Sequence, residues 1–285
     1  MPVRDDLAGR RLRRRRPNLP RYTAPTKERP MRNGILDGDE RLRSMLANCR
    51  QYWLNYGYEL SRDGDITLYS TGVRHPQLNG VMAIEGQDMD ALIGEARQRL
   101  AGHPSVWWIG PDSRGGAADA ILSNGGIRRA TMPVYAVDLA DLPDLVLPAG
   151  VTIEEVSGEA GVADWTACFA PSMGVPTEEI EKMTRVEIAR RDEPGKFVRF
   201  AAKIDGKTVG TSALLDSHGV AGIYLCSTLD GYRRRGICTA LTLRAAATGL
   251  ERGLRTGTLQ ASPMGEPVYR KLGFQKAAEY SGFVF

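Results

Sequence analysis

One short stretch constrains the fold of this chain more than any other. Residues 220–228, VAGIYLCST, have the composition of a buried strand, and residues 237–250, ICTALTLRAAATGL, have that of a helix. Between them three arginines lead into a glycine, RRRG at 233–236. The first N–H groups of a helix lack intrahelical partners and carry partial positive charge. This strand-to-helix turn therefore predicts an anion site at a helix start, suited to phosphate.

The side chains of the turn also favour an anion site. The guanidinium groups of Arg233, Arg234 and Arg235 have the fork geometry that matches phosphate oxygens. Gly236 leaves room for a ligand to approach the backbone, and Thr239 offers a hydroxyl. A solvated patch of surface charge is the alternative reading of the same residues.

The elements around this turn alternate in a definite order. After a linker rich in proline and carboxylates at 138–150, the pattern predicts a strand, two helices, three strands joined by DGK and SHG turns, a helix, a strand, a short helix and a last strand. In that order the expected ranges are 151–156, 161–170, 177–191, 197–204, 208–216, 220–228, 233–253, 256–262, 265–273 and 280–285.

Two motifs in this order carry a family resemblance. Residues 233–238, RRRGIC, resemble the R/Q-x-x-G-x-G/A motif of the GCN5-related N-acetyltransferase (GNAT) superfamily, and YRKLGF at 269–274 resembles its Tyr-x-x-Leu-Gly-Phe segment. The strand 258–262 lies between them, as that fold requires. The resemblance covers about residues 150–285. Arg234 stands where glycine is common, and Cys238 where the family has glycine or alanine.

The resemblance implies an acyl-coenzyme A donor, acetyl-CoA, and an amine that attacks it directly without a covalent enzyme intermediate. The implied donor site comprises Cys226 and Thr228 beside the pantetheine, and Arg233, Arg234, Arg235, Gly236, Ile237, Cys238 and Thr239 around the pyrophosphate. The implied catalytic groups are Tyr269, as the acid that protonates the leaving thiolate, and the backbone N–H near Ser227, which polarises the thioester.

Some of these residues also allow a structural reading. Tyr269 is suited to packing the last helix, and Cys226 and Cys238 are read as small buried residues rather than nucleophiles. A general base is not apparent, because strand 220–228 lacks a carboxylate; Glu266, Asp216 and His218 are near only in sequence. No metal site is predicted.

Residues 35–145 show helical periodicity at 37–53 and 88–101, several short strands, and a strand–helix–strand order at the end. They resemble a degenerate copy of the same fold without the arginine–glycine motif, in which Trp107 and Trp108 belong to the core. The expected fold class is therefore α/β (α+β), with two acetyltransferase-like domains at 33–145 and 146–285, each a mixed, mostly antiparallel sheet flanked by helices.

Charge is distributed unevenly along the chain. The net charge is +4, yet residues 1–32 alone carry eleven Lys/Arg and three Asp/Glu. We interpret residues 1–32 as a disordered arginine-rich tail. Three alternatives remain for it: a solvated tail, an over-long gene start with Met31 as the initiator, or an arm that contacts RNA or another polyanion.

The remaining composition favours a cytoplasmic protein. The four cysteines form no C-x-x-C pair, so neither a disulfide framework nor a zinc site is expected. No apolar run is long enough to span a bilayer, and no apolar segment follows the basic N-terminus as in a secretory signal.

Three functions stay open: acetyl-CoA-dependent N-acetylation of a small-molecule or peptide amine, acyl transfer from an aminoacyl-tRNA, and non-catalytic binding.

Overall fold

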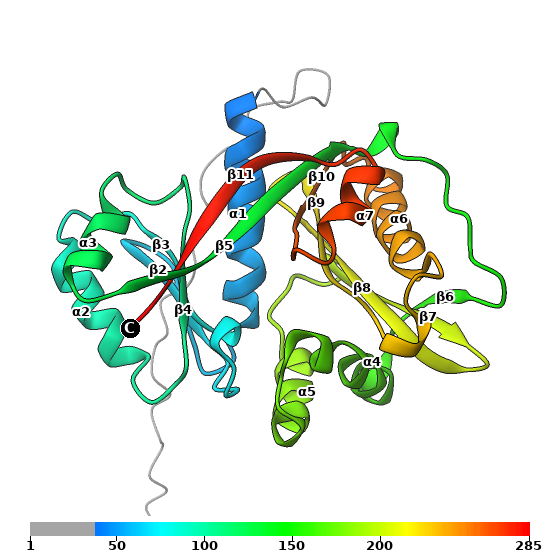
Figure 1. Cartoon of the computed structure of the whole chain (residues 1–285), viewed down its shortest axis with the longest axis horizontal. Coiled ribbons are helices and arrows are strands. Elements are labelled where there is room, and N and C mark those ends of the chain that lie inside the picture. Colours follow the sequence, from blue (N-terminus) through cyan, green and yellow to red (C-terminus); the bar gives the residue numbers. More distant parts are fainter. Residues whose placement is uncertain (1–37) are drawn as a thin grey trace, which may run out of the picture. The chain divides into compact units, whose positions relative to one another are not determined.

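The computed structural model in Figure 1 describes residues 38–285. Its α-helices are α1 (Gly38–Tyr56), α2 (Met89–Arg99), α3 (Ala117–Ser123), α4 (Gly158–Met173), α5 (Ile180–Ile188), α6 (Ile237–Glu251) and α7 (Glu266–Lys271). Short 3-10 turns are η1 (Pro76–Leu78), η2 (Leu139–Asp141), η3 (Thr177–Glu179) and η4 (Asp230–Tyr232). The predicted tail at 1–32 lies outside the described residues.

The strands are β1 (Leu60–Arg62), β2 (Ile66–Ser70), β3 (Asn79–Ile84), β4 (Val106–Ile109), β5 (Ile127–Asp138), β6 (Thr152–Glu155), β7 (Phe197–Ile204), β8 (Lys207–Ser217), β9 (Val220–Thr228), β10 (Thr256–Gln260) and β11 (Gln275–Val284). They form one sheet in the order β1-β2-β3-β4-β11-β5-β10-β9-β8-β7-β6. Among the described strands, β3–β4 and β9–β10 run parallel and the other neighbours antiparallel. The predicted class, a mixed, mostly antiparallel sheet flanked by helices, is confirmed.

The two regions exchange their last strands within this sheet. The first region ends β4–α3–β5 and the second ends β10–α7–β11, yet β4 pairs with β11 and β10 pairs with β5. β5 and β11 also pair with each other along most of their length, and they run side by side in Figure 1. We expected each region to carry its own sheet; instead one sheet includes the strands of both. The domain boundary at 145/146 stays a prediction.

The exchange also explains why β5 and β11 are longer than the sequence pattern suggested. Apolar alternation predicted strands only at 132–139 and 280–285. The extra residues of both strands are largely exposed and include Arg128, Arg129 and Lys276. Their backbones are paired by the neighbouring strand, so their side chains need no buried face to stay in the ladder.

Helix α1 belongs to the first region but packs against strands of both. Trp53 stacks on Tyr69 of β2 with ring centroids 5.0 Å apart, and Tyr52 stacks on Tyr224 of β9 at 3.9 Å. These rings belong to a core that also contains Trp165 and Phe169 of α4. A second core lies under α6 and α7, and a third, containing Trp107, under α2 and α3.

Two sequence expectations about burial and membranes can be compared with these elements. Trp107 and Trp108 are 1 % and 4 % exposed, so their assignment to the core is confirmed. Within residues 38–285 no helix is both long enough and apolar enough to cross a membrane.

Candidate functional site

The arginine–glycine turn forms a tight backbone loop at the start of α6. Arg234 has φ +62° and Gly236 has φ +79°, so two of three successive residues are left-handed. The first helical hydrogen bond runs from the N–H of Ala240 to the carbonyl of Gly236, at 2.9 Å. The N–H groups of residues 237–239 are therefore left without intrahelical acceptors, as expected of an anion-binding helix start.

The three arginines remain exposed around this loop. Arg233 pairs with Asp230 at 2.7 Å and donates to the carbonyl of Thr228 at 3.2 Å, which ties the loop to the end of β9. Arg235 lies over the ring of Tyr232, 5.4 Å from its centroid. Within the described part of the chain Arg234 makes no ion pair. The loop thus presents cationic groups together with unpaired amides.

Just before this loop, β9 separates from β10. The parallel pairing joins Val220–Gly222 to Thr256–Thr258 and then ends, although β9 continues to Thr228 and β10 to Gln260. A bulge accompanies the separation: Leu225 has φ +52°, and the register with β8 shifts between Thr211 and Ala213. We call residues 223–228 of β9 and 259–260 of β10, which do not pair with each other, the β9–β10 fork. Along the fork, β10 provides no ladder partner for the backbone of β9.

Tyr269 of α7 lies on one side of this fork. Its side chain is 6 % exposed, and its hydroxyl lies near the thiols of Cys226 and Cys238. Burial, followed by the proximity of the two thiols, raises the pKa of Tyr269 well above 10. The phenol is therefore neutral at physiological pH and has a proton to donate.

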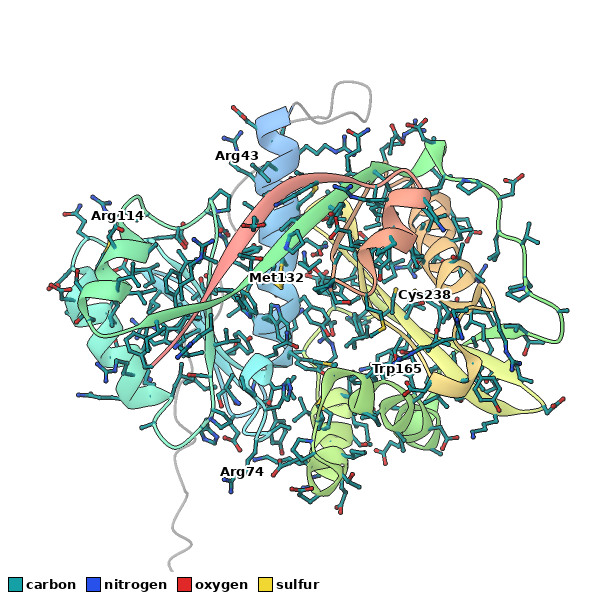
Figure 2. All side chains as sticks on the ribbon, viewed as in Figure 1. Arg43, Arg74, Arg114, Met132, Trp165 and Cys238 are labelled. Carbon is teal, nitrogen blue, oxygen red and sulfur yellow. The ribbon has the colours of Figure 1, made fainter. Side chains whose placement is uncertain are left out.

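The two thiols of the site are held as neutral groups. Cys226 Sγ lies 3.6 Å from Thr242 Oγ1, and Cys238, labelled in Figure 2, follows the first residue of α6. Burial raises the pKa of Cys226 to about 12 and also raises the pKa of Cys238. A thiol this far from ionisation is a poor nucleophile. This supports the interpretation of both as packing residues.

Ser227 faces the opposite side of β9 from Cys226. Its hydroxyl donates to Ser172 Oγ of α4 at 2.9 Å, and Ser172 donates to the carbonyl of Phe169 at 2.7 Å. The fork is thus bounded by α6 and α7 on one face and by the end of α4 on the other. All the predicted site residues, from Cys226 through Thr239 and Tyr269, gather around it; their roles remain predictions.

Two polar atoms beside the fork have no hydrogen-bond partner. Thr228 Oγ1 and Gln260 Nε2, at the ends of β9 and β10, are both shielded from solvent and unpartnered. Buried polar atoms are rarely left so in the absence of a ligand or water. The sequence analysis did not select Gln260; its only signal was a polar residue at the end of an otherwise small and apolar strand.

The three possible general bases named from the sequence do not gather at the fork. Asp216 lies at the end of β8 and His218 in the turn that joins β8 to β9, about 20 Å along the sheet from Ser227. Asp216 is paired with Lys196 at 2.9 Å. Glu266 accepts a hydrogen bond from Tyr135 at 2.6 Å and pairs with Arg270 at 3.0 Å, so it is already engaged.

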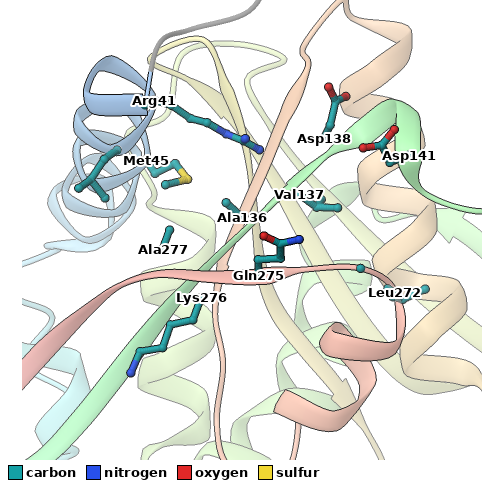
Figure 3. Close-up of a pocket in the computed structure, with 13 residues that line it drawn as sticks. Arg41, Met45, Ala136, Val137, Asp138, Asp141, Leu272, Gln275, Lys276 and Ala277 are labelled. Atoms are coloured by element: carbon teal, nitrogen blue, oxygen red, sulfur yellow. The ribbon is translucent and has the colours of Figure 1, made fainter.

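A pocket of about 380 Å³ lies elsewhere, among α1, the end of β5 and the start of β11. Figure 3 shows Arg41 reaching from α1 toward Asp138 across it. The lining residues Ala136–Asp138 pair with the start of β10, whereas the fork lies beyond the other end of that pairing. None of the predicted site residues lines this pocket. Residues 38–285 contain no group of three His, Cys, Asp or Glu arranged to hold a metal ion.

Comparison with known proteins places this geometry in a family context. Residues 161–274 match the family model described as "Acetyltransferase (GNAT) family", and they include the fork, the arginine–glycine turn and Tyr269. No curated protein matches the chain. The matched segment agrees with the extent of the resemblance inferred from the motifs.

Solved structures show the same fold. A GCN5-related N-acetyltransferase from Kribbella flavida superposes with a TM-score of 0.62 at 19 % identity, covering 83 % of this chain and 94 % of that one. One from Sphaerobacter thermophilus gives 0.58 at 16 % identity, covering 88 % and 93 %. A tandem GNAT protein from the clavulanic acid biosynthesis pathway gives 0.52 at 12 %, covering 85 % and 94 %. The fold is that of GNAT acetyltransferases; a tandem, degenerate first copy in this chain stays a prediction.

Proposed function

We propose that this protein is an N-acetyltransferase that moves the acetyl group of acetyl-CoA to a primary amine by direct attack. The observation that carries the proposal is the β9–β10 fork, flanked by a glycine-preceded helix start and by a neutral buried tyrosine. The three features lie together and each suits a different part of an acyl-CoA molecule.

The helix start suits the pyrophosphate. The amides of residues 237–239 have no intrahelical acceptors, and the adjacent guanidinium groups supply opposite charge for phosphate oxygens. Gly236 adopts φ +79°, which a side chain would strain, and an added Cβ would have only Pro148 near it, at 3.5 Å. Here glycine is needed for the backbone conformation rather than for space.

The fork suits the pantetheine arm. That arm carries amide groups, which can pair with the free backbone edge of β9 as an added strand does. The unpartnered Thr228 Oγ1 and Gln260 Nε2 are further polar atoms available to it. Cys226 brings a small side chain to this edge, consistent with a ligand that passes close to the backbone.

We assign the reacting groups from the face of the sheet on which each residue lies. The thioester supplies an activated acetyl carbon, and the backbone near Ser227 is positioned to polarise its carbonyl. Tyr269 lies on the α6–α7 face, where its hydroxyl can protonate a departing thiolate. The amine must then arrive from the α4 face, where Ser172 contacts Ser227. The identity of that amine is not part of the proposal.

Calorimetric titration with acetyl-CoA tests the donor. We expect micromolar binding that the Arg233→Ala/Arg235→Ala variant loses at least tenfold. The matched control is Arg128→Ala/Arg185→Ala, which removes the same charge from exposed positions on β5 and α5. Equal weakening in both variants would mean that net charge, not the turn, attracts the ligand.

Turnover is tested separately, by release of free coenzyme A thiol in the presence of an amine panel. Binding without release for any amine would favour a non-catalytic protein. The absence of binding at millimolar acetyl-CoA would contradict the proposal and leave an aminoacyl-tRNA donor to be examined.

A further inference from the structure

The pocket among α1, the end of β5 and the start of β11 has a lining that suits a ligand of its own. Its volume is about 380 Å³. Pockets that hold small molecules measure about 300–1,000 Å³. Its lining contains no residue of the β9–β10 fork and none of the groups assigned above to acetyl transfer. The residues that line it therefore need a separate explanation.

Arg41 of α1 is a cationic side chain of this pocket without a protein partner. Within residues 38–285 it forms no ion pair and no hydrogen bond, and its Nε is shielded from solvent. In Figure 3 its side chain extends from α1 across the pocket toward Asp138. Buried N–H donors are rarely left without an acceptor, and the planar guanidinium fork matches a carboxylate. Arg41 thus indicates a ligand that carries a carboxylate.

Two carboxylates lie on the opposite side of the pocket, where β5 passes into η2. Asp138 accepts a hydrogen bond from the N–H of Ala140 at 3.0 Å and lies 3.8 Å from Arg255. The Asp141 side chain has neither an ion pair nor a hydrogen bond in the part of the chain that the structure describes. Neither carboxylate pairs with Arg41, although all three residues line the same cavity. One unpaired positive and one unpaired negative charge therefore lie on facing walls.

Other charged residues near the pocket do not alter this balance. Lys276 lines it, but its Nζ pairs with Glu279 at 2.6 Å, and Figure 3 shows the side chain directed away from Arg41. Asp39 and Glu40 belong to the same helical turn as Arg41, but both are exposed and neither lines the pocket. A ligand in the pocket thus meets the guanidinium on one side and the two carboxylates on the other.

The rest of the lining is mainly apolar. Met45, Val137 and Leu272 are buried and Leu42 is half-buried, while two alanines and two glycines add little bulk to the walls. The side-chain amide of Gln275 is the further polar group of the lining. An aliphatic ligand group that covers these walls is favoured, because its apolar surface is removed from water.

We propose that this pocket binds the zwitterion of a small α-amino acid with an aliphatic side chain. Arg41 binds the ligand carboxylate, Asp138 and Asp141 bind its ammonium group, and the apolar walls contact its side chain. A ligand with a carboxylate alone would leave the charge of Asp141 uncompensated, and one with an ammonium group alone would leave Arg41 without an acceptor. This inference does not depend on the function proposed above.

The test is a ligand-observed NMR titration of the full chain with L-leucine, without acetyl-CoA. Two analogues each lack one charge: isocaproate lacks the ammonium group, and isoamylamine lacks the carboxylate. The variants Arg41→Met and Asp141→Asn each remove one charge from the pocket. Arg43→Met and Asp144→Asn are the matched controls, because they make the same changes at exposed positions outside the lining.

We expect L-leucine to bind with a Kd of about 1 mM or below, and each analogue to bind about tenfold more weakly or worse. Arg41→Met should weaken L-leucine binding about tenfold. Asp141→Asn should weaken it about fivefold, because Asp138 still faces the ammonium group. Both control variants should bind within about twofold of the wild type, and the Tm of all four variants should stay within about 2 °C of it.

Three results would overturn the proposal. No binding of L-leucine at about 20 mM would show that the pocket does not hold an amino acid. Equal affinity for isocaproate and L-leucine would show that the carboxylates play no part. Undiminished binding in Arg41→Met and Asp141→Asn would place the amino acid elsewhere on the protein. The titration contains no acetyl-CoA, so each of these results leaves the proposed acetyl transfer untouched.

Discussion

The side-chain oxygen of Asn48 on α1 occupies the space that a Cβ at Gly222 of β9 would need. Asn48 cannot easily move away, because it accepts a hydrogen bond from Tyr224 at 2.7 Å and donates to the carbonyl of Leu215 and to Ser217 Oγ at 3.1 and 2.9 Å. A helix from the first region is thereby fixed against the strand that later forms the fork.

Gly222→Ala should therefore destabilise the protein. The added methyl group would meet both Asn48 and Tyr224, whose Cε2 would be 2.5 Å away. Overpacking of this kind costs about 1–3 kcal/mol, to be measured by urea unfolding. Gly94→Ala is the control, since it lies in α2 with nothing within 4 Å and should be neutral or slightly stabilising. Equal effects of the two substitutions would refute this account of the Asn48 contact.

Glu187→Gln should destabilise the protein more strongly. The carboxylate is fully buried, pairs with Arg199 at 2.7 Å and accepts from the Tyr56 hydroxyl at 2.5 Å. Removing one partner of a buried pair costs about 3–5 kcal/mol, because the remaining charge stays desolvated. Glu181→Gln, in an exposed pair with Arg185, should cost less than about 0.5 kcal/mol. A loss of similar size at both positions would contradict the buried-pair explanation.

Tyr269→Phe should lower the kcat of acetyl transfer by about 10²–10⁴-fold and leave acetyl-CoA affinity unchanged. The substitution removes the proton donor but keeps the ring that packs against Phe274 at 5.9 Å. Because the pKa of Tyr269 is raised, the hydroxyl stays protonated above pH 10, so this residue should cause no loss of kcat up to that pH. The control is Tyr58→Phe, at an exposed tyrosine. An unchanged kcat in Tyr269→Phe would mean that Tyr269 contributes to packing and not to catalysis.

The cysteines should react slowly in the folded protein. Burial raises the pKa of Cys49 and of Cys226 to about 12 and that of Cys168 to about 11, and it also raises the pKa of Cys238. At pH 8 the thiolate fraction of Cys226 is then roughly a thousandfold below that of a free cysteine. Iodoacetamide labelling followed by mass spectrometry should show little modification until urea is added. Rapid labelling of native Cys226 would show that its thiol is not held as described.

Removing residues 1–30 should leave acetyl transfer to small amines within twofold of the full chain. Any binding to RNA, measured by filter retention at several salt concentrations, should weaken and lose salt dependence, because residues 1–30 carry more positive charge than the net +4 of the whole chain. A large loss of transfer activity would instead favour an aminoacyl-tRNA donor.

Most elements and the local form of the site could be predicted from the amino-acid sequence. The RRRG turn at 233–236 was predicted as a helix start with free amides, because caps and dipoles depend on residues close in the chain. The periodicities of β7, β8, β9 and α6 likewise predicted elements that the structure contains. Tyr269 was selected by its motif, although its contact with Cys226 and Cys238 could not be derived from spacing.

The pairing of the strands, and the contacts of first-region residues with the second region, became apparent only in the three-dimensional fold. Alternation predicts that β5 and β11 exist, but it carries no information about partners, so their exchange between the regions could not be foreseen. For the same reason Gln260 was missed. In sequence it is an ordinary polar residue, whereas in the fold long-range packing shields its Nε2 from water and leaves that atom without a partner.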